Sequence, residues 1–79
     1  MNITLHIYTP EWNREETATA VFLPGALCPF EVLPGHAPII STLSGGRLRW
    51  RTPAGEESIE IKGGAVKVEN NIIDVCAEV

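Results

Sequence analysis

The sequence predicts an all-β fold, a small antiparallel β-sandwich or flattened barrel. Apolar and polar residues alternate with a period of two through several segments, which is typical of strands with one buried face. Closely spaced turn residues separate these segments, and no stretch of useful length has helical periodicity. The pattern indicates roughly seven or eight short strands, and a chain of 79 residues is expected to form a single domain over residues 1–79.

The N-terminal part of the chain is expected to contain two strands. Residues 3–8 alternate between aliphatic and polar side chains, and Pro10 ends the alternation. Residues 17–23 are rich in β-branched side chains and are followed by Pro24 and Gly25, which predicts a second strand closed by a turn. Between these strands, residues 11–16 are expected to form a turn or a short helical bend.

A β-hairpin is predicted next, because residues 47–51 and 58–62 both alternate and are joined through the turn sequence Pro-Ala-Gly-Glu. If Thr52 pairs with Glu57, apolar side chains meet on one face and opposite charges meet on the other. A slip of one residue would mix the two faces and is therefore rejected. The expected pairs are Trp50–Ile59, Leu48–Ile61, Arg49–Glu60 and, as the one flaw, Arg47–Lys62.

A second hairpin is predicted over residues 66–75. Asn70 and Asn71 suit a two-residue turn because asparagine tolerates positive φ. The glycine pairs at residues 45–46 and 63–64 are expected to mark the starts of strands. The expected pairs are Glu69–Ile72, Val68–Ile73, Lys67–Asp74 and Val66–Val75.

The composition argues against several classes of partner. Six basic and ten acidic residues give a net charge of −4, which argues against nucleic acid and against attachment to anionic lipid. Neither cysteine belongs to a Cys-x-x-Cys pair, so a reduced, intracellular chain without a disulfide framework is expected. The N-terminus lacks the pattern of a signal peptide, and no apolar run is long enough to span a membrane.

The two histidines and two cysteines are the candidates for catalysis or metal binding. His6 lies on the polar face of the first strand, where a solvated histidine is expected. His36 is near Glu31 and Ser41, but this spacing matches no arrangement of base, orienting acid and nucleophile, so no catalytic residue is predicted. A zinc site formed by both histidines and both cysteines would have suitable ligands, yet no pair has ligand spacing, so no metal or cofactor is predicted.

Other conspicuous side chains have structural interpretations. Cys28 is expected to be a small buried residue beside Pro29, and Trp50 is expected in the core. Trp12 lies among polar residues, where it is either half-buried or an anchor for a partner. The arginine stripe at positions 47, 49 and 51 is expected to be a solvated face balanced by Glu60 and neighbouring acids.

Residues 24–38 contain four of the six prolines. Proline restricts the unfolded chain, so a stiff exposed loop is expected here, and rigid exposed loops are typical binding surfaces. The sequence therefore favours an interaction module over an enzyme. It leaves open a free-standing small β-domain that binds a ligand, a metal or a protein partner, and a small hydrolase that uses His36 is the weakest alternative.

The run Leu-Pro-Gly-His-Ala-Pro at residues 33–38 resembles a signature of the epsilon subunit of bacterial F-type ATP synthases, in which this run follows the third strand. The similarity continues through residues 39–43 and 57–68, and it includes residues 5–11, so it spans nearly the whole chain. The resemblance implies a β-sandwich of about ten strands, and together with the alternation about eight to ten short strands are predicted.

The resemblance implies a non-catalytic rotor subunit without a cofactor. In this family the domain lies at the foot of the central stalk, packs on the gamma subunit and rests on the membrane c-ring, and it couples ion-driven rotation to ATP synthesis. A peripheral location at the cytoplasmic face of the bacterial inner membrane is also implied. The residues expected to contact the c-ring and the gamma subunit are Pro29, Glu31, Pro34, Gly35, His36, Ala37 and Pro38, with Thr9 and Ser41 near the gamma subunit.

Two departures from the family pattern limit what is carried over. Residues 27–32, before the motif, lack the glycines that are usual in the family. The sequence ends at Val79, before the C-terminal helical hairpin that usually follows, which indicates a naturally short form or an excised domain. The inhibition of ATP hydrolysis and the ATP binding that belong to this hairpin are therefore not expected here.

Overall fold

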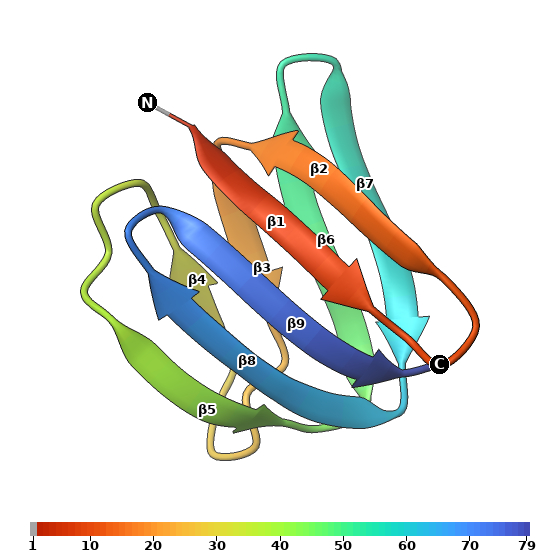
Figure 1. Ribbon diagram of the computed structural model, residues 1–79. Helices are drawn as coiled ribbons and strands as arrows, with labels where there is room; N and C mark the ends of the chain where they lie inside the picture. The colour runs from red at the N-terminus through yellow and green to blue at the C-terminus, as the bar shows by residue number, and fades with distance from the viewer. Residues whose placement is uncertain (1) are drawn as a thin grey trace.

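The computed structural model describes residues 2–79, and this part of the chain forms nine strands in two sheets that pack face to face (Figure 1). The predicted β-sandwich of about eight to ten strands is confirmed. No helix in this range is long and apolar enough to cross a membrane. The strands are β1 (Ile3–Tyr8), β2 (Asn13–Ala18), β3 (Ala20–Leu23), β4 (Phe30–Val32), β5 (Ile39–Leu43), β6 (Gly46–Thr52), β7 (Gly55–Ile61), β8 (Gly63–Glu69) and β9 (Ile72–Glu78).

The two sheets differ in size and strand order. The larger sheet has the order β2-β1-β9-β8-β5, and the smaller sheet has the order β4-β3-β6-β7. All strand pairs are antiparallel except β1 and β9, which run parallel in the middle of the larger sheet. The predicted antiparallel arrangement is therefore right for every pair but this one. The parallel pair joins the first and last strands of the chain within one sheet.

Alternation places the apolar side chains of both sheets in one buried layer. Ile3, Leu5 and Ile7 of β1 are fully buried, and so are Leu48 and Trp50 of β6 in the other sheet. The predicted core position of the tryptophan is confirmed. Within residues 2–79 no buried residue is polar or charged. Each large side chain in this layer stabilises the fold by about 1.5–3 kcal/mol relative to leaving it exposed.

The predicted turn or helical bend at residues 11–16 is right only for residues 11 and 12, which lie in the turn between β1 and β2, and is wrong for residues 13–16. Instead β2 begins at Asn13 and pairs antiparallel with β1 along its whole length. It is an edge strand, and only Ala18 of its six residues is buried. Because an edge strand beside the open side of a sandwich needs few apolar residues, its polar sequence does not reveal it as a strand.

The predicted strand over residues 17–23 is divided between the two sheets. β2 ends at Ala18 and β3 begins at Ala20, in different sheets. The N–H of Thr19, which lies between them, donates to the carbonyl of Arg51 at 2.8 Å. The chain therefore crosses from one sheet to the other at a single residue, and a single β-branched stretch contributes to both.

The hairpin of β6 and β7 forms as predicted, but its register is wrong by two residues. Thr52 pairs with Gly55 and not with Glu57, and Pro53 and Ala54 form the turn. The Thr52 hydroxyl closes the turn, since it donates to the Gly55 carbonyl at 3.1 Å and accepts from the Ala54 N–H at 3.2 Å. A shift of two residues leaves every side chain on the same face, so the hydrophobic pattern does not distinguish the two registers. The observed pairs include Trp50–Glu57, Leu48–Ile59, Arg49–Ser58 and, in place of the expected Arg47–Lys62, Arg47–Glu60.

The hairpin of β8 and β9 has the predicted register throughout. Asn70 and Asn71 have φ values of 53° and 61°, as a two-residue turn with positive φ at both positions requires. The glycine pairs also mark strand starts as predicted, because β6 begins at Gly46 and β8 begins at Gly63. A two-residue turn at these positions allows the two strands only one register, so the turn sequence was sufficient to predict it.

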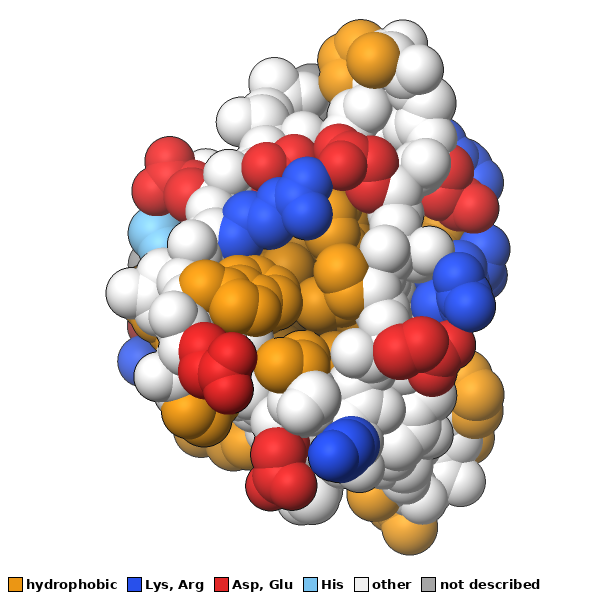
Figure 2. Space-filling model, turned by 90° about the vertical axis from the view of Figure 1, so that its right-hand side faces the viewer, with side chains coloured by type: hydrophobic (Ala, Val, Ile, Leu, Met, Phe, Trp, Pro, Cys, Tyr) orange, Lys and Arg blue, Asp and Glu red, His pale blue; other side chains and the backbone are white. Residues whose placement is uncertain are grey.

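Arg14 bridges the two sheets at the open side between the edge strands β2 and β7. Its guanidinium donates to Glu57 of β7 at 2.7 Å and to Glu16 of β2 at 3.2 Å, and it lies 5.2 Å from the centre of the Trp50 ring. Burial alone would lower the pKa of Arg14, but the hydrogen bonds and charges of both glutamates outweigh this effect and raise that pKa. Figure 2 shows the right-hand side of Figure 1, where hydrophobic side chains are framed by acidic and basic ones.

We expect Leu48→Ala to lower the free energy of unfolding by about 2–5 kcal/mol, because it removes a fully buried side chain from the shared layer. Ile40→Thr is the control, since Ile40 is 82% exposed and threonine keeps the β-branched shape; we expect a change of at most about 0.5 kcal/mol. Chemical denaturation of both variants measures these values. Similar losses in the two variants would contradict the assignment of the core.

Candidate functional site

Residues 24–38 connect β3 to β5 but do not form one continuous loop. β4 (Phe30–Val32) interrupts the segment and pairs with β3. The stiff loop predicted over the whole segment is therefore wrong. Two separate tips remain on either side of β4 (Figure 1): the first tip is residues 24–29 and the second tip is residues 33–38.

The first tip is bonded to the end of β5 through its backbone. The Ala26 N–H donates to the Thr42 carbonyl at 2.9 Å, and the Ser44 N–H donates to the Pro24 carbonyl at 2.8 Å. Residues 26–29 of the tip are exposed, Cys28 among them, so the prediction that this cysteine is buried is wrong. The prolines and these backbone bonds hold an exposed tip in place without burying it.

The second tip begins with a tight turn. The His36 N–H donates to the Leu33 carbonyl at 3.1 Å, and Gly35 has a φ of 84°. Proline followed by a residue with positive φ is the arrangement of a type II turn. A Cβ at Gly35 would have no atom within 4 Å, so the backbone angle, not lack of space, requires glycine. The turn follows β4, whereas the family pattern places the motif after the third strand.

His36 is half-buried and its ring is engaged locally. Its Nδ1 lies 2.7 Å from the carbonyl oxygen of Ala37, so Nδ1–H donates to that oxygen. Within residues 2–79 no hydrogen bond joins His36 to Glu31 or Ser41. Ala37 and Pro38, which follow, are both exposed. The second tip therefore presents a rigid surface in which the imidazole is held by its own backbone.

His6 is more constrained than the predicted solvated histidine, because only 28% of its side chain is exposed. The Tyr8 hydroxyl lies 3.0 Å from its Nδ1, and a carboxylate oxygen of Glu15 lies 3.4 Å from its Nε2. Cys28 and Cys76 are both free and exposed. In the described part of the chain, no three His, Cys, Asp or Glu side chains gather closely enough to hold a metal ion.

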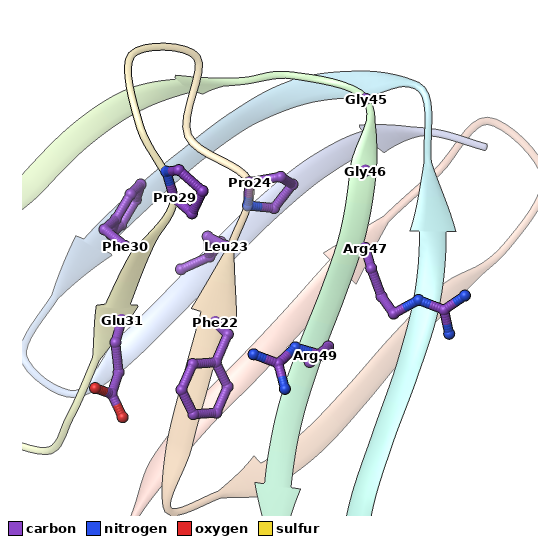
Figure 3. A pocket seen from close by; sticks show the side chains of 10 residues that line it. All are labelled: Phe22, Leu23, Pro24, Pro29, Phe30, Glu31, Gly45, Gly46, Arg47 and Arg49. Carbon is purple, nitrogen blue, oxygen red and sulfur yellow. The ribbon is translucent and has the colours of Figure 1, made fainter.

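Pro29 and Glu31 line a groove on the outer face of the smaller sheet, with a volume of about 530 Å³ (Figure 3). Apolar side chains from β3, β4 and the first tip form most of its walls, and two arginines of β6 form the other side. The apolar lining residues are Phe22, Leu23, Pro24, Pro29 and Phe30, and the charged ones are Glu31, Arg47 and Arg49.

The groove carries opposite charges on its two sides. Glu31 on β4 is paired with Phe22 on β3, which is paired with Arg49 on β6, so a carboxylate, an aromatic ring and a guanidinium form one row. The guanidinium of Arg49 lies 4.5 Å from the centre of the Phe22 ring, and that of Arg51 lies 5.5 Å away. Arg49 also donates to Glu56 at 3.2 Å, as the prediction of an acid-balanced arginine face requires. The arginines additionally cover an aromatic ring, which was not predicted.

Thr9 and Ser41 lie away from both tips' exposed ends. The Thr9 hydroxyl accepts from the Trp12 N–H at 2.9 Å and donates to the Trp12 carbonyl at 2.7 Å, so it closes the turn between β1 and β2. Ser41 is half-buried in β5 and pairs with Val66. The nine predicted interface residues therefore do not form one site: Pro29 and Glu31 line the groove, residues 34–38 belong to the second tip, Ser41 lies in β5, and Thr9 lies in the turn between β1 and β2.

The sequence did not identify three residues that shape the groove and the second tip. Phe22 lies between the buried Val21 and Leu23, and an aromatic residue on the exposed face of such a strand is a detectable signal for a binding surface. Arg49 was recognised only as part of a solvated stripe. Asn71 was recognised only as a turn residue, and its side-chain oxygen accepts the Gly35 N–H at 2.6 Å.

Comparison with known proteins identifies relatives over the whole described chain. A protein-family model described as the ATP synthase delta/epsilon chain β-sandwich domain matches residues 2–79. The ATP synthase epsilon chain of Desulfitobacterium hafniense is 37% identical over 76 residues, which cover 95% of this chain and 58% of the relative. That of Microcystis aeruginosa is 37% identical over 78 residues, covering 95% and 55%. The chain therefore spans little more than half the length of these curated relatives.

Two solved assemblies contain chains with the same fold. A chain of the mitochondrial ATP synthase of Euglena gracilis, in a cryo-EM structure of its OSCP, F1 and c-ring parts, has a TM-score of 0.88 at 21% identity; the match covers 96% of this chain and 50% of that chain. A chain of the central stalk and c-ring of the Tetrahymena thermophila mitochondrial ATP synthase has a TM-score of 0.83 at 13% identity, covering 100% and 65%. At these identities the likeness establishes the fold alone.

We expect Gly35→Ala to lower the free energy of unfolding by about 1–2 kcal/mol, because a Cβ disfavours the positive φ of the turn while meeting no neighbouring atom. Gly35→Asn is the matched variant and should lose less, since asparagine visits this backbone region more readily. Urea denaturation of both variants gives the comparison. Equal stability of Gly35→Ala and the parent chain would show that the turn does not need this angle.

Proposed function

The chain belongs to the family of ATP synthase delta/epsilon-chain β-sandwich domains, and from this membership we propose that it is a non-catalytic rotor subunit of an F-type ATP synthase. The observation that carries the proposal is the family match over residues 2–79. In this role the chain is part of the central stalk and helps to couple ion-driven rotation of the c-ring to ATP synthesis. It is a peripheral subunit at the cytoplasmic face of the bacterial inner membrane, held by protein partners and not by lipid.

The proposed gamma-facing surface is the second tip together with the outer face of the larger sheet. Three large hydrophobic side chains project outward from this sheet: Tyr8, Ile40 and Ile72 are 38%, 82% and 44% exposed. Leu33 at the start of the second tip is 50% exposed. Exposed apolar side chains that gather on one side of a small domain are typical of a protein interface. Thr9 follows Tyr8 at the end of β1, whereas Ser41, next to Ile40 in β5, turns its side chain to the opposite face, so only its backbone lies near this surface.

The proposed c-ring contact is the first tip with the adjoining groove. The tip projects from the body of the domain, and the side chain of Leu27 is fully exposed. The groove offers a carboxylate and two arginines around an apolar floor, which suits polar protein loops that carry charges of either sign. Two partners at two places would explain why the predicted residues do not form a single site.

A free-standing β-domain that binds a small ligand in the groove is the second candidate function. The observation in its favour is the groove volume of about 530 Å³, within the size range of small-molecule sites. The two candidates differ in one decisive respect, because only the rotor subunit must form a stable complex with gamma. Catalysis is not part of either candidate, because within residues 2–79 no Ser, Thr or Cys side chain is hydrogen-bonded to the His36 ring.

We expect the chain to form a complex with the gamma subunit of the same organism at micromolar concentration. His36→Trp should weaken this complex at least about tenfold, since a bulky ring at the second tip would prevent close packing. Ala54→Trp, in the exposed turn between β6 and β7, is the control and should bind like the parent chain. Isothermal titration gives the dissociation constants. Absence of a complex with the unmodified chain would exclude the proposed function.

We expect Glu31→Lys to reduce association with purified c-rings, in the presence of gamma, by about tenfold, because it reverses the charge on one side of the groove. Ala54→Lys places the same positive side chain in the exposed turn between β6 and β7, away from the groove and from the larger sheet, and should have no effect. Co-sedimentation with c-ring proteoliposomes measures the association. If both variants behave alike, the groove is not the c-ring contact.

A further inference from the structure

The second tip is tied to the hairpin of β8 and β9 by one hydrogen bond. The Gly35 N–H donates to the side-chain oxygen Oδ1 of Asn71 at 2.6 Å. Within residues 2–79 no other side-chain hydrogen bond links the second tip to another element, since the His36 ring bonds to its own neighbour. The orientation of the tip therefore depends on a residue in a different turn.

The identity of residue 71 is unusual for the turn in which it lies. A two-residue hairpin turn with positive φ at both positions strongly favours glycine at the second position, where this chain has Asn71 with a φ of 61°. Asn70, at the first position, is exposed and its side chain makes no hydrogen bond within the described residues. Asparagine at position 71 adopts this positive φ less readily than glycine would, but its side chain supplies a hydrogen-bond acceptor to the second tip.

The acceptor acts on the peptide group that determines the type of the turn. Type I and type II turns differ chiefly by a flip of the peptide between their two central residues, which here are Pro34 and Gly35. The N–H of that peptide is the group that Asn71 binds. Because the flip would turn this N–H away from Oδ1, the hydrogen bond selects the type II form.

We propose that Asn71 is a positioning residue that holds the second tip in the one conformation in which it binds a protein partner. The inference rests on the proposed function, because it takes the second tip as part of the gamma-facing surface. A tip held in advance loses less conformational freedom when it binds, and this is a general source of affinity. Asn71 makes this contribution through Gly35, so it is required even where it does not touch the partner.

The test uses three variants of the 79-residue chain. Asn71→Gly removes the acceptor but suits the hairpin turn at least as well as asparagine, so its stability should equal or exceed that of the parent chain. Asn71→Asp keeps an oxygen acceptor at the same position and should restore parent behaviour. Asn70→Gly is the matched control, which changes the neighbouring residue of the same turn without touching the hydrogen bond.

The first measurement needs no partner. Amide hydrogen exchange followed by NMR should show the Gly35 N–H of Asn71→Gly exchanging about tenfold faster than in the parent chain, while the other two variants leave it unchanged. The second measurement is the affinity for gamma, which should fall about two- to tenfold for Asn71→Gly alone.

The two measurements separate this inference from the proposed function. Unchanged exchange at Gly35, or gamma binding by Asn71→Gly as tight as that of the parent chain, would overturn the positioning role while the parent's own binding still supports the rotor function. Failure of the parent chain to bind gamma would overturn the rotor function together with the binding part of this inference. In that case the exchange of the Gly35 amide still decides whether Asn71 holds the turn.

Discussion

Close packing of the two inner sheet faces is the constraint on which the rest of the structure depends. Neither sheet can leave its apolar face in water, and a chain of 79 residues has only this one layer to bury. Trp50 is the largest fully buried side chain of the layer. At the open side between β2 and β7 the layer is covered by Arg14, which is bonded to one glutamate in each sheet. The open side of the sandwich is thus closed by an ion-pair network between the two edge strands.

The two tips and the groove are placed by the packing of the two sheets and not by their own local sequence. β4 divides the proline-rich segment because it is needed as the edge of the smaller sheet, and the division creates two tips that face different directions. The first tip is fastened to the end of β5, and the second is fastened to Asn71 in another hairpin. Prolines limit the number of conformations that each tip can adopt, and hydrogen bonds to residues distant in sequence determine which conformation is present. This separation suits the proposed role, in which the chain contacts two partners.

The outer faces of the two sheets have different chemical characters. The smaller sheet carries arginines over Phe22, with Glu31 across the groove, so its surface is charged around an aromatic centre. The larger sheet exposes Ile40 and Ile72, but its outer face also carries charged side chains, among them the ion pair of Lys67 with Glu69.

The sequence by itself determined the fold class, most of the strands and the whole register of the second hairpin. These features follow from period-two alternation and from turn residues such as Asn70 and Asn71, which act over a few neighbouring positions. Only the tertiary structure decided the existence of β2, the register of the first hairpin and the parallel pairing of β1 with β9. The row from Glu31 to Arg49 and the bond from Gly35 to Asn71 also belong to the tertiary structure. An edge strand needs little hydrophobic signal, a shift of two residues leaves the pattern intact, and contacts between distant residues leave no trace in local periodicity.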